Sequence, residues 1–194
     1  MAKEDDDRND KNKDTFAAVS QNLFKSRTVL IFGEVNTKLA QSVTAQLLAL
    51  SVESDAPIRI FINSQGGHVE SGDTIHDVIR FVRPEIKMIG TGWVASAGAL
   101  IFVSAKKENR VCLPNTRFML HQPMGGVGGQ ASDIEIETRQ MLQMRERLNR
   151  LFARETGQSY DQVVRETERN FWMTATEAKE YGLIGNIIES SDQI

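Results

Sequence analysis

The chain has 194 residues, of which 40% are hydrophobic and 25% charged, and its formal net charge is -3. This length and composition are typical of one globular domain with a full hydrophobic core. The lack of a basic surplus argues against nucleic acid as the main partner. No apolar run reaches the roughly 18 residues that a membrane-spanning helix needs, so we expect no membrane insertion.

The N-terminal segment and the cysteine content indicate the compartment. Residues 1–14 mix acidic and basic side chains without an apolar core, so they do not form a secretory signal. We expect residues 1–20 to be a mobile polar segment and residues 21–194 to be a single domain. Cys112 is the only cysteine, which excludes an intramolecular disulfide and thiol metal clusters and favours a cytoplasmic location. No metal or other cofactor is implied.

Short apolar strands alternate with amphipathic helices along much of the chain. Strands are predicted over residues 28–32, 58–62, 87–90, 110–113 and 118–120, and helices after Asn36, over 71–83 and from near Ser96. Gly33 is expected to end the first strand, and residues 64–67 are expected to form a tight turn. Because strands that alternate with helices are joined by parallel crossovers, the pattern predicts an α/β fold.

A long helix is predicted over residues 133–155, after the glycine-rich run 125–129. Ser132 and Glu135 have the spacing of a capping box, and Gly157 is expected to end the helix. Its apolar face is formed by Ile134, Met141, Met144, Leu148 and Leu151. Such a helix is long for the edge of one small domain. It either projects and needs a second surface to cover this face, or it is an ordinary core helix.

Ser96 lies among small residues directly after a predicted strand, in the segment Gly92–Ala99. Small neighbours allow the strand to turn sharply into a helix, which leaves the hydroxyl exposed beside backbone N–H groups. A nucleophile needs this placement, because those groups stabilise the oxyanion that forms on attack. His121 ends another predicted strand, and strand ends of α/β proteins meet at one edge of the sheet. Ser96 and His121 are therefore a candidate nucleophile and base, with a packing turn and a structural histidine as the alternatives.

A set of motifs along residues 25–188 resembles the proteolytic subunit of the Clp protease, the ClpP family. These motifs are Ile62–Gly67, Ala95–Ala99, Cys112–Asn115, His121–Gly126, Gly129–Ile134 and Thr176–Ile184. The resemblance implies a crotonase-like fold and a serine protease of protein quality control. It also implies heptameric rings stacked as a double ring, interlocked by the helix that begins near Ser132, which the family calls the handle.

The resemblance also implies the site residues and the partners. It assigns the nucleophile Ser96, the general base His121, the third triad member Asn170, the oxyanion-hole N–H groups of Gly67 and Ala97, and the substrate-pairing residues Met124, Gly125 and Gly126. The peptidase core would need no ATP itself. A partner AAA+ unfoldase would supply unfolded proteins, while short peptides would be cleaved directly.

Three departures from the family pattern predict a divergent paralogue. Asn170 stands where aspartate is usual, and in trypsin-like proteases that exchange lowers kcat by about 10⁴-fold. Phe61 and Phe81 match the aromatic pocket that docks unfoldase loops, but Arg59 replaces an aromatic residue there and disfavours an apolar loop. The polar N-terminal segment does not match the apolar axial loop of the family. We expect weak or conditional activity alone, in rings formed either by copies of this chain or together with a second ClpP paralogue; the alternative function is a structural or regulatory ring subunit with negligible turnover.

Overall fold

The computed structural model describes residue 15 and residues 17–194. The strands in these residues form one seven-stranded sheet. The strands are β1 (Thr28–Val35), β2 (Ile58–Gly67), β3 (Ile86–Ala95), β4 (Arg110–Cys112), β5 (Arg117–Leu120), β6 (Phe171–Thr174) and β7 (Asn186–Ile187). The α-helices are α2 (Thr37–Glu53), α3 (Val69–Phe81), α4 (Ala97–Phe102), α5 (Ala131–Thr156), α6 (Tyr160–Thr167) and α7 (Ala175–Tyr181), with short 3-10 helices at Lys107–Asn109 and Ser191–Gln193.

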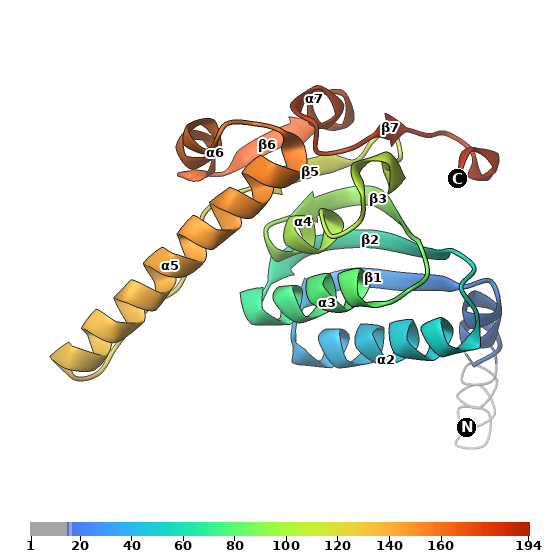
Figure 1. Ribbon diagram of the computed structural model, residues 1–194, viewed down its shortest axis with the longest axis horizontal. Coiled ribbons are helices and arrows are strands. Elements are labelled where there is room, and N and C mark those ends of the chain that lie inside the picture. Colours follow the sequence, from blue (N-terminus) through green and yellow to red (C-terminus); the bar gives the residue numbers. More distant parts are fainter. Residues whose placement is uncertain (1–14, 16) are drawn as a thin grey trace, which may run out of the picture.

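The main part of the sheet is parallel, in the order β1-β2-β3-β4-β7. Helices α2, α3 and α4 lie side by side along it (Figure 1). Strands and helices thus alternate along this part of the chain, as the sequence predicted. Alternate residues of β2, Ile58, Ile60 and Ile62, are fully buried in the core. The predicted α/β class is therefore confirmed.

Strand β3 changes partner along its length, and this positions the site. Its first half pairs with β4, and its second half, Trp93–Ala95, pairs in parallel with β5. Strand β6 then pairs antiparallel with β5, so that Leu120 lies opposite Phe171. The carboxyl ends of β3 and β5 and the amino end of β6 consequently meet at one edge of the sheet.

Two partly exposed tryptophans stack on each other across these same strands. Trp93 of β3 and Trp172 of β6 stack with their ring centroids 6.1 Å apart and an interplanar angle of 8°. The guanidinium of Arg117, on β5 between them in pairing order, lies 5.0 Å from the centre of the Trp172 ring. Stacking and cation–π contact thus link all three strands on the exposed side of the sheet.

Two glycine-containing segments that were predicted to break strands belong to strands instead. Strand β1 continues through Gly33 to Val35, with a register shift between Phe32 and Glu34. The predicted tight turn at residues 64–67 is wrong as well, because these residues form the end of β2 and pair with the end of β1. In both places glycine accommodates an irregular strand, which the sequence pattern alone does not distinguish from a turn.

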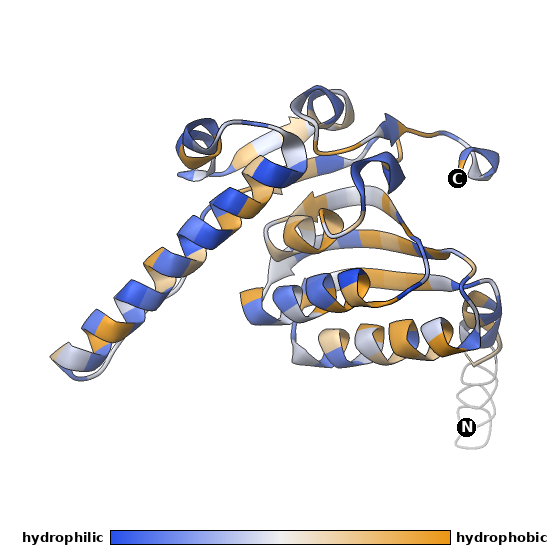
Figure 2. Cartoon of the chain, viewed as in Figure 1, coloured by the Kyte–Doolittle hydropathy of each residue, from blue (hydrophilic) through white to orange (hydrophobic). Residues whose placement is uncertain are grey.

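Helix α5 projects from the body of the molecule (Figure 1). Of the two alternatives that the sequence left open, a projecting helix and an ordinary core helix, the structure has the first. The buried residues lie near its end: Leu148, Asn149, Leu151, Phe152 and Thr156. Closer to its start, Ile134, Ile136 and Leu142 are 39%, 53% and 59% exposed. Figure 2 shows that hydrophobic positions are scattered along a mostly hydrophilic helix α5. The described chain therefore leaves these three apolar side chains uncovered, of which Ile134 belongs to the predicted apolar face of α5.

The two ends of α5 differ in how well they were predicted. Gly157 ends the helix in the left-handed conformation, with φ 81°, as expected. The predicted capping box is wrong: the N-cap is Gln130, no side chain caps the helix, and Ser132 already lies inside its first turn. Glu135 instead forms an ion pair with Arg139 one turn later, at 3.0 Å.

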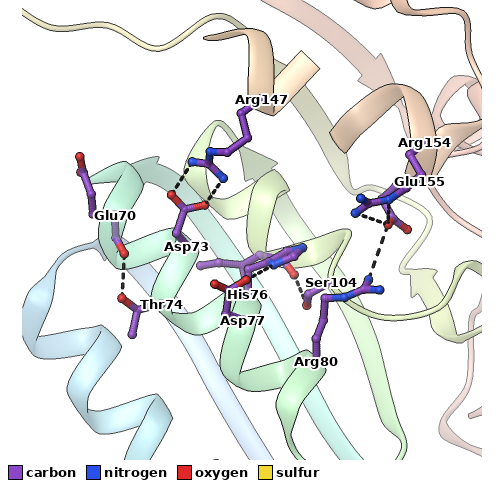
Figure 3. Close-up of polar contacts among 11 residues, drawn as sticks. Glu70, Asp73, Thr74, His76, Asp77, Arg80, Ser104, Arg147, Arg154 and Glu155 are labelled. Atoms are coloured by element: carbon purple, nitrogen blue, oxygen red, sulfur yellow. Dashed lines mark hydrogen bonds and ion pairs between the residues drawn. The ribbon is translucent and has the colours of Figure 1, made fainter. Parts of the chain in front are cut away.

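A pair of charged residues joins α5 to the body of the molecule. Arg147 of α5 donates two hydrogen bonds to the carboxylate of Asp73 on α3, at 2.9 and 2.6 Å (Figure 3). Such a fork-to-carboxylate contact fixes both distance and orientation. It holds α5 against α3 at the point where the projecting helix meets the body of the molecule.

The N-terminal region is described in part. Residues 17–25 form a helix that precedes β1. The expectation of a mobile segment over residues 1–20 stays a prediction, and residues 1–14 and 16 of that segment lie outside the described residues. Within the described part of the chain, no helix combines the length and apolarity needed to cross a membrane.

Candidate active site

Ser96 occupies a strained turn between β3 and α4. Its backbone has φ 53° and ψ -122°, a conformation that residues other than glycine rarely adopt. Its N–H donates to the carbonyl of Met119 on β5 at 2.9 Å, which extends the β3–β5 pairing by one residue. A serine on a sharp strand-to-helix turn presents its hydroxyl outward, as in a nucleophile elbow. The half-buried Ser96 thus has the local structure that the sequence predicted.

The backbone of Gly66 closes this turn from the β2 side. A Cβ at Gly66 would lie 2.6 Å from the Cβ of Ser96, 2.8 Å from the Ala95 carbonyl oxygen and 3.0 Å from the Ala97 nitrogen. Gly66 also has φ 95°, which strains any other residue. Sequence reasoning placed Gly66 in a motif but gave it no role. The structure shows that the Ser96 turn has space for glycine alone at this position.

His121 directly follows β5 and lies beside Ser96. Its Nε2 is 2.7 Å from the Ser96 Oγ, a hydrogen-bonding distance for a base and its nucleophile. The parallel register that pairs Ala95 with Met119 brings the residues just beyond these strand ends together. The chain's other histidines lie elsewhere: His68 contacts Ser71 and Glu70, and His76 is buried on α3 beside Asp77.

Asn170 reaches the other side of the imidazole from the start of β6. Since Leu120 lies opposite Phe171 in the antiparallel pair, Asn170 comes next to His121, near enough for its side chain to raise the pKa of the imidazole. Asn170 itself is exposed in this chain. The structure therefore brings Ser96, His121 and Asn170 into one chain of contacts.

Gln122 holds the segment that carries Asn170. Its backbone N–H donates to the Thr167 carbonyl at 2.7 Å, and its side-chain Nε2 donates to the Glu168 carbonyl at 2.8 Å. Sequence reasoning attached no function to Gln122. Its position directly after His121 was visible in the sequence, but the two carbonyls that it binds come from a segment distant in sequence.

The pKa of His121 is lowered from that of an ordinary histidine. Partial burial is the larger cause, because it disfavours the imidazolium, and the hydrogen bond with Asn170 opposes it by raising the pKa. A lowered pKa keeps the imidazole neutral at pH 7. In this form Nε2 can accept a proton from the Ser96 hydroxyl.

The predicted oxyanion-hole residues lie at two backbone positions beside Ser96. Ala97 is the first residue of α4, so its N–H has no partner within that helix. Gly67 ends β2, directly after the glycine whose backbone packs on Ser96 and Ala97. The end of β2 and the start of α4 therefore both adjoin the turn that carries Ser96.

Two of the three predicted substrate residues, Met124 and Gly126, line an open groove next to this edge. Residues 121–128 form neither helix nor strand, Met124 is 80% exposed, and no atom lies within 4 Å of the place of a Gly126 Cβ. A groove of about 270 Å³ runs between this segment, the start of α3 and α5. Its lining includes Gly67, Val69, Met124, Met141 and Met144, with the carboxylates of Glu70 and Glu137.

The residues of the predicted aromatic pocket are spread over strand and helix ends. Phe61 is half-buried on β2, while Phe81, at the end of α3, is 79% exposed. The Arg59 guanidinium donates to the Ser26 carbonyl at 3.0 Å, so this half-buried charge has a backbone partner.

In the described residues, no cluster of histidine, cysteine and acidic side chains could hold a metal ion.

Comparison with known proteins identifies the family of this chain. The sequence pattern of the Clp protease family matches residues 10–191. The chain belongs to the Clp protease family. Proteolytic subunit 2 of the ATP-dependent Clp protease from Gluconobacter oxydans is 58% identical over 100% of this chain and 89% of its own length. The corresponding subunit 2 from Pseudomonas aeruginosa is 51% identical over 97% of this chain and 96% of its own.

Solved structures of the family share the fold. ClpP1 from Listeria monocytogenes is 55% identical and superposes with a TM-score of 0.82, covering 90% of this chain and 98% of its own. A variant of that protein with one asparagine changed to aspartate gives a TM-score of 0.84 over the same shares. The chain is thus a Clp-type serine peptidase with the ClpP fold, from a family whose subunits assemble as rings.

Proposed function

We propose that this chain is the peptidase core of a self-compartmentalised protease, with Ser96 as the nucleophile. The observation that carries this proposal is the 2.7 Å contact between the Ser96 Oγ and the His121 Nε2, at a serine held in a strained turn. Ser96 attacks a peptide carbonyl while His121 takes its proton, and the imidazolium then gives that proton to the leaving amine. Water, deprotonated by the same imidazole, releases the acyl group and restores Ser96.

Main-chain N–H groups would stabilise the negative oxygen of each tetrahedral intermediate. The N–H groups of Gly67 and Ala97 are the candidates, because both backbones adjoin the serine turn. Fixed donors of this kind need no reorganisation as charge develops, and one donor is worth about 10²–10³-fold in rate. The close fit of Gly66 against Ser96 keeps nucleophile and donors in a fixed relation.

The segment Met124–Gly126 would bind the substrate backbone as an added strand. It belongs to neither a helix nor a strand, and the open space beside Gly126 leaves room for a second backbone. The adjoining groove would take the side chain before the cleaved bond. Because Val69, Met141 and Met144 line it together with Glu70 and Glu137, it favours apolar side chains and disfavours acidic ones.

Asn170 would make the isolated chain a weak or conditional enzyme. An asparagine oxygen can accept the Nδ1–H of His121, but it carries no charge to stabilise the imidazolium. The amide can also turn and donate, which favours the tautomer with the proton on Nε2 and blocks proton transfer from Ser96. Peptide hydrolysis alone should therefore be slow, and assembly would supply what the isolated site lacks.

Assembly would cover the exposed apolar face of α5. We propose heptameric rings stacked as a double ring through α5, formed with copies of this chain or with a second ClpP paralogue. An AAA+ unfoldase would feed unfolded proteins to the chamber, in the cytoplasm. The apolar residues Ile134, Ile136 and Leu142, exposed on the projecting part of α5, support an interface there, because association would remove their side chains from water.

A structural or regulatory ring subunit is the second candidate function. Asn170 and Arg59 favour it, since the first removes the charge expected at the triad and the second places a cation where an aromatic residue is usual. In this case the chain would form rings and shape a partner ring without turnover of its own. The retained contact between Ser96 and His121 favours the enzyme, because a structural subunit has no need of it.

Serine-reactive labelling and peptide turnover separate the two functions. A fluorophosphonate probe and a fluorogenic leucine-ended peptide are applied to the purified chain, alone and mixed with a ClpP that carries the usual aspartate. Labelling of Ser96 with turnover, lost in Ser96→Ala, is the expected result; in the mixture, the partner carries its own Ser→Ala change. Absence of labelling in both samples would establish the structural subunit.

A further inference from the structure

A cationic hollow lies at the opposite end of the strands from Ser96. It has a volume of about 280 Å³ and lies where β1, β2 and β3 begin. Its charged lining consists of Lys25, Arg27, Arg59 and Lys87, and the C-terminal residue Ile194 lies at its rim. No aspartate or glutamate side chain lines it. Positive charge is thus concentrated at this hollow, although the whole sequence has a net charge of -3.

Two of the four cations are fixed by backbone carbonyls. Arg27 donates from Nε to Ala56 and from Nη2 to Ser54, both at 3.0 Å, and Arg59 donates to Ser26. These neutral acceptors orient both guanidinium groups. Arg27 also forms an ion pair with Glu53, at 3.6 Å and outside the hollow, whereas Arg59 has no carboxylate within ion-pair distance among the described residues. The walls of the hollow are therefore preorganised as well as positive.

The two lysines supply charge that nothing in the described chain compensates. Among the described residues, neither Lys25 nor Lys87 has a carboxylate within ion-pair distance, and Ile194 lines the hollow without such a contact. Lysine ammonium groups on flexible stems can close on an incoming anion.

We propose that the hollow binds an acidic peptide segment of a partner protein, through side-chain carboxylates held by Lys25, Arg27, Arg59 and Lys87. The charge complementarity selects a ligand with several carboxylates, and the small size of the hollow fits a short segment rather than an extended polyanion. The site is separate from the peptidase chemistry, since it lies beyond the opposite ends of β2 and β3. Binding here would attach a partner to the end of the subunit remote from the nucleophile.

Binding of a fluorescein-labelled hexaglutamate peptide to the full chain tests this proposal by fluorescence anisotropy. The double variant Lys25→Gln/Lys87→Gln should bind about tenfold more weakly, since two solvent-accessible ion pairs are lost. The matched control Lys38→Gln/Lys106→Gln removes the same charge from exposed lysines outside the hollow and should bind as the unaltered chain does. Circular dichroism checks that each variant is folded.

Three results would overturn the proposal. They are equal binding by the Lys25/Lys87 variant, an equal loss in the control variant, and displacement of the peptide by inorganic phosphate at the same molar concentration. The last would identify a general anion site rather than a peptide site. The Ser96→Ala chain should bind hexaglutamate as tightly as the unaltered chain, so the result does not depend on whether the chain hydrolyses peptides.

Discussion

Gly66 and Ser96 lie so close that a single methyl group on Gly66 would collide with the Cβ of Ser96, at 2.6 Å. This contact joins the end of β2 to the turn after β3, and it orients the serine independently of His121. The nucleophile is therefore positioned by packing against a backbone as well as by its hydrogen bond. Substitutions at Gly66 test how much the packing contributes.

Gly66→Ala should lower kcat/KM for a fluorogenic peptide by about 10²-fold, because a displacement near 1 Å at a reacting atom has that effect. The left-handed φ of 95° adds strain for alanine. Gly128→Ala is the matched control, since its Cβ meets no atom within 4 Å and should leave the rate unchanged. Equal rates for both variants would show that the fit at Gly66 does not position Ser96.

Asn170→Asp should raise peptide hydrolysis by the isolated chain by about tenfold or more, because a carboxylate stabilises the imidazolium and fixes its tautomer. Turnover of a fluorogenic peptide measures it, with Asn22→Asp as a control that adds the same charge at an exposed residue near the N-terminus. An unchanged rate, or a native chain that is already fully active, would contradict the role given to Asn170.

The pH profile of kcat/KM should reflect the lowered pKa of His121. The base must be neutral, so activity falls as pH drops through this pKa, and the acid limb should lie below about pH 6.5. In Asn170→Asp the added negative charge favours the imidazolium, raises the pKa and moves that limb to higher pH. A limb at or above pH 6.5 in the unaltered chain would contradict the effect of burial.

Cys112 should be inert to thiol reagents in the folded chain. Burial raises the pKa of its thiol to about 11, which leaves little thiolate at neutral pH, and the side chain is fully buried. Iodoacetamide should leave peptide turnover unchanged and Cys112 unmodified by mass spectrometry, whereas in denaturant it should react. Inactivation of the native chain would point to a thiol in the chemistry.

The Asp73–Arg147 pair should stabilise the attachment of α5 by about 0.5–1 kcal/mol, the range for a well-oriented ion pair near the surface. A double-mutant cycle with Asp73→Asn and Arg147→Gln, followed by urea unfolding, gives the coupling free energy. The control cycle uses Glu146 and Arg150, which pair within α5 and do not reach α3. A smaller coupling for Asp73–Arg147 than for this control would argue against an attachment role.

The periodic elements of this protein were predictable from local sequence. Asn36 caps α2 as expected, accepting the Leu39 N–H at 3.0 Å, and Gly157 ends α5. Both are decided by a few neighbouring residues with strong conformational preferences. The errors occurred where glycine has more than one use: Gly33 and Gly66 were expected to leave strands but lie within them.

The site was predictable in its members but not in all of its supports. Ser96 and His121 each follow a strand, so convergence at one sheet edge was foreseeable from the α/β pattern. The contribution of Asn170 depends on β6 running antiparallel to β5, which no local pattern specifies. The same holds for Gln122, whose partners at Thr167 and Glu168 become neighbours only through that pairing.

The stacked indoles of Trp93 and Trp172 provide the molecule with its own optical probe. They are the chain's two tryptophans, and they belong to the strands that lead to Ser96 and from Asn170. Any sliding of β6 against β3 would separate the rings and change their emission. Intrinsic fluorescence can therefore follow the alignment of nucleophile and third triad member in real time, during ring assembly and without an attached dye.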